Sequence, residues 1–327
     1  MRRLIAILVI LVVLALAWAG GWFALASWAR GQVSTVLAEV ESRGINVECG
    51  GRDVVGFPFA LRIACAETAV AERGSGTEAQ LAGLTGGASI FAPRTARIAL
   101  ASPARLDSPL LAGPATMSWD EAGIDVGMGL NGPRAVAFDA ESVAADLPVS
   151  AFPDAALAAD TAAGTLAPAA DGGTDATLAF SGLALSAEGT AFPPFDGTMS
   201  AWLSPSPRAL MSGRAGLQAP LSLRGLDVLL SSGAARLQAL GDLAVDADGI
   251  LDGVVTLRIA GAEALPDFIA ALPPEHQKLG NAAAGGLIAF GKATTLNGEP
   301  ASELTVEIVR GKARVGPVEV TVPRLPL

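Results

Sequence analysis

The two cysteines are the residues of this chain with the clearest chemistry. Cys49 and Cys65 lie on either side of the segment Gly56-Phe57-Pro58-Phe59, and each ends a short run of alternating residues. Two such runs around a glycine- and proline-containing turn predict a hairpin with one cysteine on each arm. In an oxidising compartment we expect Cys49 and Cys65 to form a disulfide. A metal or redox pair is the alternative, although there is neither CxxC spacing nor a nearby histidine.

Catalytic motifs give little support to an enzyme. His276 is the sole histidine, so one chain offers no paired-histidine metal site, and its place at a predicted helix start favours a solvated surface residue. The patterns GxSxG, SxxK and HExxH do not occur. We therefore predict no catalytic residue, no cofactor and no metal ion. Carboxylates for glycan hydrolysis are a minor alternative, because Asp and Glu occur throughout the chain.

Two glycine-rich segments resemble ligand-binding loops. Residues 127–132 match GxGxxG, but Pro133 follows and a strand pattern resumes, whereas a dinucleotide site needs a helix there. Residues 246–253 resemble a calcium loop, but Leu257 stands where an EF-hand has its bidentate glutamate. Both segments are better explained as hairpin turns, with a weak calcium site as the alternative for the second.

The N-terminal segment is long and apolar enough to be a membrane anchor. Leu4 to Ala29 contains no charged residue, against the roughly 20 residues that a helix needs to cross a bilayer. Arg2 and Arg3 precede it and Arg30 follows, which predicts a cytoplasmic N-terminus and an extracytoplasmic remainder. A cleaved signal peptide is the alternative.

The predicted organisation has three parts. Residues 1–30 are the anchor, residues 31–43 a connecting amphipathic helix, and residues 44–327 an extracytoplasmic β-rich domain. A segment rich in Pro and Gly near residues 163–173 is predicted to be a loop and a possible boundary between two halves. Leu265 to Asn281, interrupted by two prolines, is the main helical candidate beyond the anchor.

Short alternating runs separated by Gly, Pro and Asp-Gly dominate the rest of the chain. They predict a mainly β fold: an extended, curved antiparallel meander, either an open groove or a partial barrel, with one or two short helices. Leu304, Val306 and Ile308 alternate with polar residues in the clearest run. Such a strand needs a core or a ligand on its apolar face, so these three residues are candidates to line an apolar groove.

Composition and charge narrow the class of partner. The chain is 51% hydrophobic but only 5% aromatic, and small side chains of this kind suit thin layers of paired strands. Without Arg2, Arg3 and Arg30, 19 of the 22 basic residues stand against 32 acidic ones, a net charge of −13. A domain this acidic disfavours nucleic acid as a partner.

Three features together resemble a bacterial family grouped as domain of unknown function 2125. They are the apolar N-terminal segment, the Gly-Phe-Pro-Phe segment between two cysteines, and a closing segment from Gly311 to Pro326. This resemblance implies no established activity, catalytic residue or cofactor. The architecture is also similar, more loosely, to AsmA-type envelope proteins, which implies a curved sheet with an apolar concave face and a role in lipid homeostasis.

The first functional hypothesis is a non-enzymatic protein anchored in the bacterial inner membrane, whose sheet binds lipid or another apolar ligand in the periplasm. An ordinary closed core would explain the composition equally well. The alternative is an envelope scaffold that binds a protein partner through a sheet edge or an exposed patch.

Overall fold

The computed structural model describes most of the chain: residues 10, 13–14, 16–27, 31, 41–42, 44–72, 76–109, 111–129, 132–149, 154–187, 189–211, 220–261, 270, 277, 291–315 and 318–322. His276 and most of the predicted helix Leu265 to Asn281 lie outside the described residues. The same holds for most of residues 31–43 and for parts of the predicted anchor.

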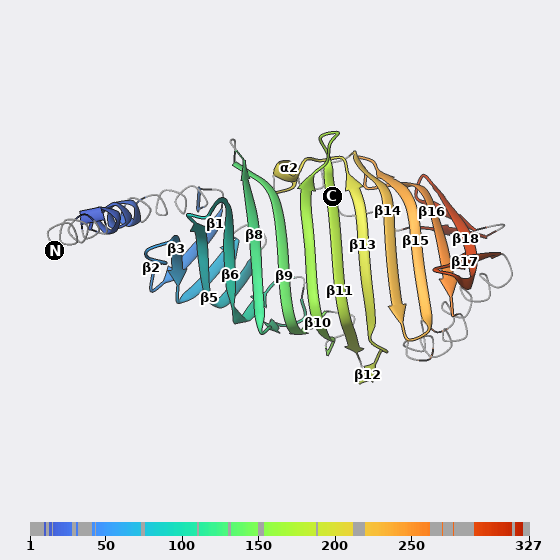
Figure 1. Cartoon of the computed structure of the whole chain (residues 1–327). Helices are drawn as coiled ribbons and strands as arrows, with labels where there is room; N and C mark the ends of the chain where they lie inside the picture. Colours follow the sequence, from blue (N-terminus) through green and yellow to red (C-terminus); the bar gives the residue numbers. More distant parts are fainter. Residues whose placement is uncertain are drawn as a thin grey trace.

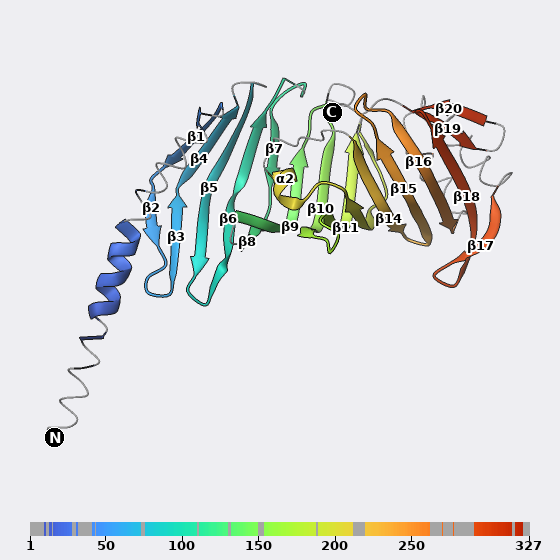
Figure 2. The ribbon, with the colours of Figure 1, turned by 90° about the horizontal axis from the view of Figure 1, so that it is seen from above.

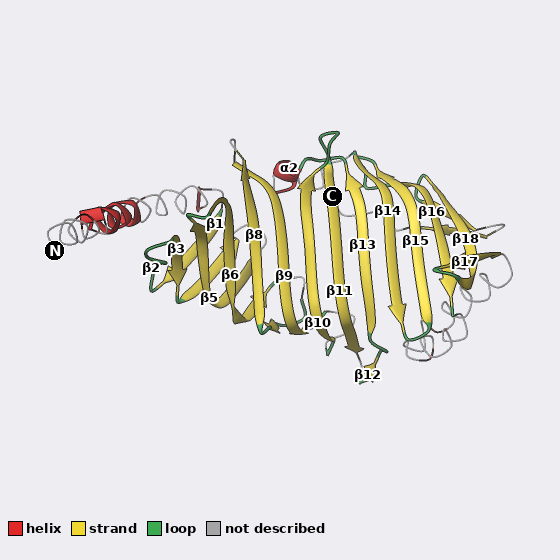
Figure 3. Ribbon diagram, in the orientation of Figure 1, coloured by secondary structure: helices red, strands yellow, loops and turns green. Residues whose placement is uncertain are grey.

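One antiparallel sheet contains all twenty described strands (Figures 1 and 3). The strands are β1 (Ile45–Gly50), β2 (Asp53–Val55), β3 (Ala60–Cys65), β4 (Glu67–Glu72), β5 (Thr77–Ser89), β6 (Ala92–Asp107), β7 (Ala115–Ser118), β8 (Glu121–Gly129), β9 (Gly132–Asp146), β10 (Ala156–Pro168), β11 (Thr174–Ala187), β12 (Thr190–Ala191), β13 (Phe195–Leu203), β14 (Leu221–Ser232), β15 (Ala235–Val245), β16 (Leu251–Ala260), β17 (Lys292–Leu296), β18 (Glu299–Val309), β19 (Lys312–Val315) and β20 (Val318–Thr321). A mainly β, antiparallel fold was predicted and is confirmed.

Chain neighbours are mostly sheet neighbours, as in a meander. From β8 through β9, β10, β11, β13, β14, β15 and β16 to β18, each strand pairs with the next of this series. Figures 1 and 2 show the resulting twisted and curved sheet, with β1 to β3 at one end and β17 and β18 at the other. Among the described residues, β1 and β2 pair with β4 and β3, and β17 and β20 pair with β18 and β19, so the two ends of the sheet do not join and the sheet is open.

The predicted cysteine hairpin is present and carries the disulfide. β1 pairs with β4 and β2 with β3 in one continuous register, broken around Gly51 and Ala66. Cys49 and Cys65 flank this break with their Cα atoms 5.2 Å apart, and they are disulfide-bonded. The turn between β2 and β3 is the Gly-Phe-Pro-Phe segment, in which Gly56 has a φ of +103° and accepts hydrogen bonds from Phe59 and Ala60.

Several strands are longer than the sequence pattern indicated. β10 extends to Pro168 and pairs on both sides, with β9 and β11, so the loop predicted at residues 163–173 is wrong in its first half. The sheet runs without interruption through this segment. The reason is local: alanine, glycine and threonine in β10 break the apolar alternation, but their backbone groups still complete the hydrogen-bond ladder.

Two helical segments are described besides the sheet. Residues 16–27 form a helix next to the β2–β3 end of the sheet (Figure 2), and α2 (Pro207–Met211) lies against β9 and β10. Among the described residues, no helix is both long and apolar enough to span a bilayer.

Small side chains make up most of the buried interior. Alanines dominate the described hydrophobic residues with less than a tenth of their surface exposed: Ala26, Ala60, Ala104, Ala115, Ala122, Ala145, Ala159, Ala176, Ala201 and Ala260. The larger aliphatic residues among them are half as many: Val54, Leu221, Val245, Leu296 and Ile308. Burial therefore comes from tightly paired strands and not from a thick core, as the composition indicated.

Candidate functional site

The three residues predicted to line a groove share one face of β18. Leu304 and Val306 stand directly opposite Leu257 and Val255 of β16, and Ile308 lies further along the same face. Directly paired residues of antiparallel strands have side chains on the same face. The apolar face of β18 therefore continues onto β16.

This continuity extends across nearly the whole sheet as one row of directly paired residues. The row consists of Leu304, Leu257, Ala239, Val228, Met199, Leu178, Gly164, Phe138, Ile124, Ile98, Gly86, Ile63 and Val54. Every member is apolar or glycine. We call the side of the sheet that carries this row the apolar face.

The next row along the strands is mostly polar and belongs to the other side of the sheet. It consists of Thr305, Thr256, Leu240, Asp227, Ser200, Thr177, Thr165, Ala137, Asp125, Arg97, Gly87, Arg62 and Val55. Since successive residues of a strand point to opposite faces, the sheet separates apolar from polar side chains along its length. The side chains of such a polar face can form their hydrogen bonds with water, so this face needs no covering layer.

Side chains of the apolar face are only partly covered. Ile308 and Val54 are buried, but Leu304 and Val306 are half-buried and Phe138 remains 40% exposed. The apolar face is thus not the interior of a closed globule.

Two hollows on this face are lined almost wholly by apolar atoms. One, of about 380 Å³, lies over β5 to β9 and includes Leu100, Ile124 and Phe138. The other, of about 340 Å³, lies over β13 to β16 and includes Leu237 and Ile259. Both are in the size range of small-molecule sites. Their lining fits hydrocarbon better than a polar or charged ligand.

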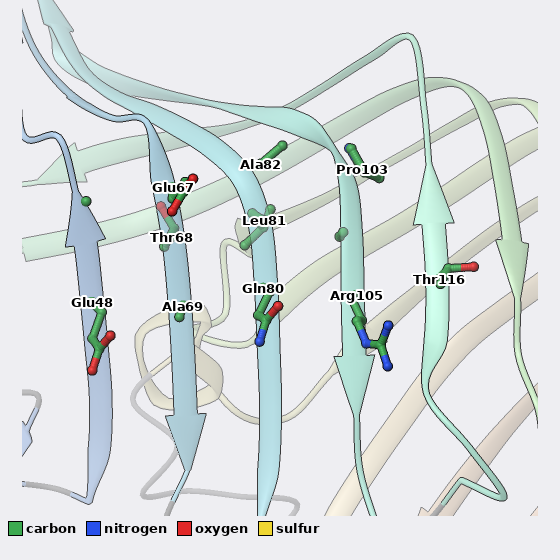
Figure 4. Close-up of a pocket in the computed structure, with 12 residues that line it drawn as sticks. Glu48, Glu67, Thr68, Ala69, Gln80, Leu81, Ala82, Pro103, Arg105 and Thr116 are labelled. Carbon is green, nitrogen blue, oxygen red and sulfur yellow. The ribbon is translucent and has the colours of Figure 1, made fainter.

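A third hollow of about 690 Å³ lies near the first hairpin and has a different character (Figure 4). Glu48, Gln80 and Arg105 line it from β1, β5 and β6, with β4 between β1 and β5. The hydroxyl of Thr68 in its wall is buried and has no hydrogen-bond partner among the described groups. A larger part of its lining surface is polar than in the other two hollows, so it is a poorer match to an acyl chain.

Arg97 ties three strands together on the polar face. Its guanidinium donates to Asp125 on β8 at 2.8 Å and to both carboxylate oxygens of Asp139 on β9 at 2.9 and 2.8 Å. Glu121 lies 3.6 Å away. The hydrogen bonds from Arg97 hold the pKa of Asp139 below its usual value. The cluster therefore joins β6, β8 and β9 through side chains as well as through the backbone hydrogen bonds.

We expect Arg97→Leu to lower the free energy of unfolding by about 1 kcal/mol at pH 7, because Arg97 and Asp139 are 41% and 44% exposed and solvent screens the pair. A depressed carboxyl pKa stabilises the fold above the unfolded value of about 4. This contribution is lost as the pH falls through the lower folded pKa of Asp139. Urea unfolding should therefore show a larger difference between the variant and the wild type at pH 7 than at pH 2.5.

Arg134→Leu on β9, the strand that carries Asp139, is the control, because Arg134 forms no ion pair among the described residues. An equal loss of stability for Arg97→Leu at both pH values would contradict an electrostatic role for the cluster.

The remaining sequence motifs are turns where the structure describes them. Gly127 and Gly132 belong to the β8–β9 hairpin. The carboxylate of Asp246 accepts hydrogen bonds from the backbone of Asp248 and Ile250 within the β15–β16 turn. No cluster of three metal-binding side chains occurs among the described residues.

Sequence reasoning missed one contact near the disulfide. Trp22 and Phe23 of helix 16–27 pack on Phe57 in the β2–β3 turn, with ring centroids 5.3 and 5.9 Å from it. The signal that could have revealed it is the presence of Phe57, Phe59 and Phe91 in two turns, where small polar residues are usual.

The fold and the site together define a class: an open antiparallel β-sheet protein with a half-exposed apolar face and a polar opposite face. A family model described as "Uncharacterized protein conserved in bacteria (DUF2125)" matches residues 22–323, and the chain belongs to this family. No curated protein and no solved structure matches the chain. The similarity to AsmA-type proteins stays a prediction.

Proposed function

We propose that this protein is a non-enzymatic, membrane-anchored protein of the bacterial cell envelope that binds lipid acyl chains, or a ligand of similar apolarity, on the apolar face of its sheet. The observation that carries the proposal is the unbroken apolar row from Val54 to Leu304, together with its partial exposure. Apolar area that remains in contact with water costs about 25 cal/mol per Å² relative to burial. An apolar ligand that covers it is therefore favoured.

Location is the second part of the proposal. The single membrane span lies within the uncharged segment from Leu4 to Ala29, and the sheet lies on the periplasmic side. The disulfide between Cys49 and Cys65 supports this placement, because disulfides persist in oxidising compartments.

Photo-crosslinking in intact bacteria tests the proposal on the full chain. A photoreactive phenylalanine analogue replaces Val306 on the apolar face or, as the matched control, Thr305 on the opposite face of the same strand. After irradiation of cells grown with radiolabelled phosphate, we expect label on the protein with the analogue at position 306 and none with the analogue at position 305. The two positions are adjacent in β18, so we expect the two variants to be expressed at the same level and in the same location.

Two outcomes would count against lipid binding. The absence of labelled lipid at position 306, with the protein present at normal levels in the membrane, would contradict it directly. Crosslinks to another protein at either position, without lipid, would favour the scaffold hypothesis instead.

A further inference from the structure

Two turns at the first end of the sheet lie side by side and carry exposed aromatic rings. The β2–β3 turn contains Phe57 and Phe59, and the β5–β6 turn contains Ile90 and Phe91. The backbone amide of Ile90 donates to the carbonyl of Phe59 at 3.0 Å, and the rings of Phe59 and Phe91 lie 5.7 Å apart. We call these four residues the aromatic tip.

The aromatic tip is unusually exposed for its chemistry. Phe57, Phe59, Ile90 and Phe91 are 51%, 54%, 45% and 77% exposed. Large apolar side chains scattered singly over a surface are ordinary, but a contiguous group marks an interaction site. Trp22 and Phe23 pack on Phe57, yet each of the four tip side chains keeps 45% or more of its surface exposed.

Helix 16–27 packs against the β2–β3 turn, which is part of the aromatic tip. The indole of Trp22 donates to the carbonyl oxygen of Ala60 at 3.0 Å, and the indole of Trp18 donates to that of Pro58 at 3.2 Å. Trp22 also makes an edge contact with Phe57. Two separate hydrogen bonds and a ring contact hold the helix against the turn.

Along the axis of the helix, the apex of the β2–β3 turn lies beside Trp18. Because Trp22 lies at the base of the turn and Trp18 at Pro58 near its apex, the chain before Trp18 continues past the turn, away from the sheet (Figure 2). Leu16, Leu14 and Ile10, which precede Trp18, are 68%, 60% and 58% exposed.

Charge around the tip favours an anionic surface. Neither turn contains a charged residue between Val54 and Leu61 or between Ala88 and Pro93, and Arg62 and Arg94 follow them directly. These two arginines form no ion pair among the described residues. In a chain with a net charge of −10, unpaired arginines beside exposed aromatic rings fit phospholipid headgroups.

We infer that the aromatic tip is a second membrane contact, in which Phe57, Phe59, Ile90 and Phe91 insert into the interface of the leaflet that the N-terminal helix leaves. This inference rests on the proposed membrane anchor. Trp18 would then lie at the same interfacial depth, where indoles are favoured. Leu61 and Ala88, a directly paired couple of β3 and β5 next to the tip, belong to the apolar face. The contact therefore brings one end of the apolar face to the bilayer surface.

Fluorescence quenching in liposomes tests this contact on the full chain. The described cysteines are both in the disulfide, so a Phe91→Cys variant can be labelled with an environment-sensitive dye at one site. Thr295→Cys on β17, exposed and at the other end of the sheet, is the matched control. The liposomes contain phosphatidylethanolamine and phosphatidylglycerol, with or without a spin-labelled lipid that quenches near the headgroups.

We expect the dye at position 91 to be quenched at least twofold more by the spin-labelled lipid than the dye at position 295. Aqueous iodide should show the opposite order. Equal iodide quenching at both positions, in protein that floats with the liposomes, would overturn the inference and leave the anchor intact. Shielding from iodide at position 91 without lipid quenching would overturn it in favour of contact with a second protein. Protein that does not float with the liposomes would overturn the anchor and the inference together.

Discussion

A Gly87→Ala variant is expected to unfold at a clearly lower urea concentration than the wild type, with a loss of about 2–4 kcal/mol in the free energy of unfolding. Gly87 lies on β5 opposite Arg62 of β3. A Cβ atom at this position would overlap the carbonyl oxygen of Leu61 and lie 2.6 Å from the Cα of Arg62. Backbone atoms within a paired strand cannot move aside without breaking the hydrogen-bond ladder.

The adjacent glycine provides the control for this prediction. At Gly86 the nearest atoms to an added Cβ are those of the Ile98 side chain, at 3.5 Å or more, which is ordinary van der Waals contact. Gly86→Ala should therefore be neutral or slightly stabilising, because alanine has fewer unfolded conformations than glycine. If the two variants lost stability equally, the close approach of β3 to β5 at Gly87 would not be the cause.

Loss of the disulfide is the second large effect. The bond joins residues 16 positions apart, and a cross-link that closes a loop of this size contributes about 3 kcal/mol in the chain-entropy description. A Cys49→Ser, Cys65→Ser double variant should therefore lose about 3 kcal/mol in urea unfolding at pH 7. The wild type treated with a reductant should lose the same amount, while the double variant should not respond to reductant. A wild type whose stability is unchanged on full reduction would contradict this role.

The β2–β3 end of the sheet is therefore held by constraints of three kinds. The disulfide, the close packing at Gly87 and the hydrogen bonds from Trp18 and Trp22 all act within a short distance along the first hairpin and β5. If the aromatic tip enters the bilayer interface, this rigidity has a use: it sets the orientation of the sheet relative to the membrane. A looser junction would not keep the apolar face at the bilayer surface.

Local chemistry was enough to predict several elements. The alternation of Leu304, Val306 and Ile308 with polar residues predicted a strand with one apolar face, and β18 confirms it. The glycine- and proline-containing turn between two alternating runs predicted the hairpin and the pairing of Cys49 with Cys65. These features depend on neighbours in the sequence, so their physical causes are visible in a short window.

Strand length and the extent of the apolar face needed the tertiary structure. β10 contains too few large apolar residues to show an alternation. Its strand conformation is stabilised by backbone hydrogen bonds to β9 and β11 on both sides. Glycines such as Gly164 interrupt the apolar pattern in the sequence. In the sheet, Gly164 stands opposite both Phe138 and Leu178, whose side chains continue the row.

What the sequence determined by itself is the class of structure: a β-rich chain with an apolar N-terminal segment, a cysteine-bearing hairpin and strands that are apolar on one side. Only the tertiary structure decided that these sides join into one continuous face that stays partly exposed, and that helix 16–27 is fastened beside the aromatic tip. The physical reason is that alternation fixes which side chains share a face within one strand. The register between strands, and what covers the face, depend on hydrogen bonds and contacts between residues far apart in the chain.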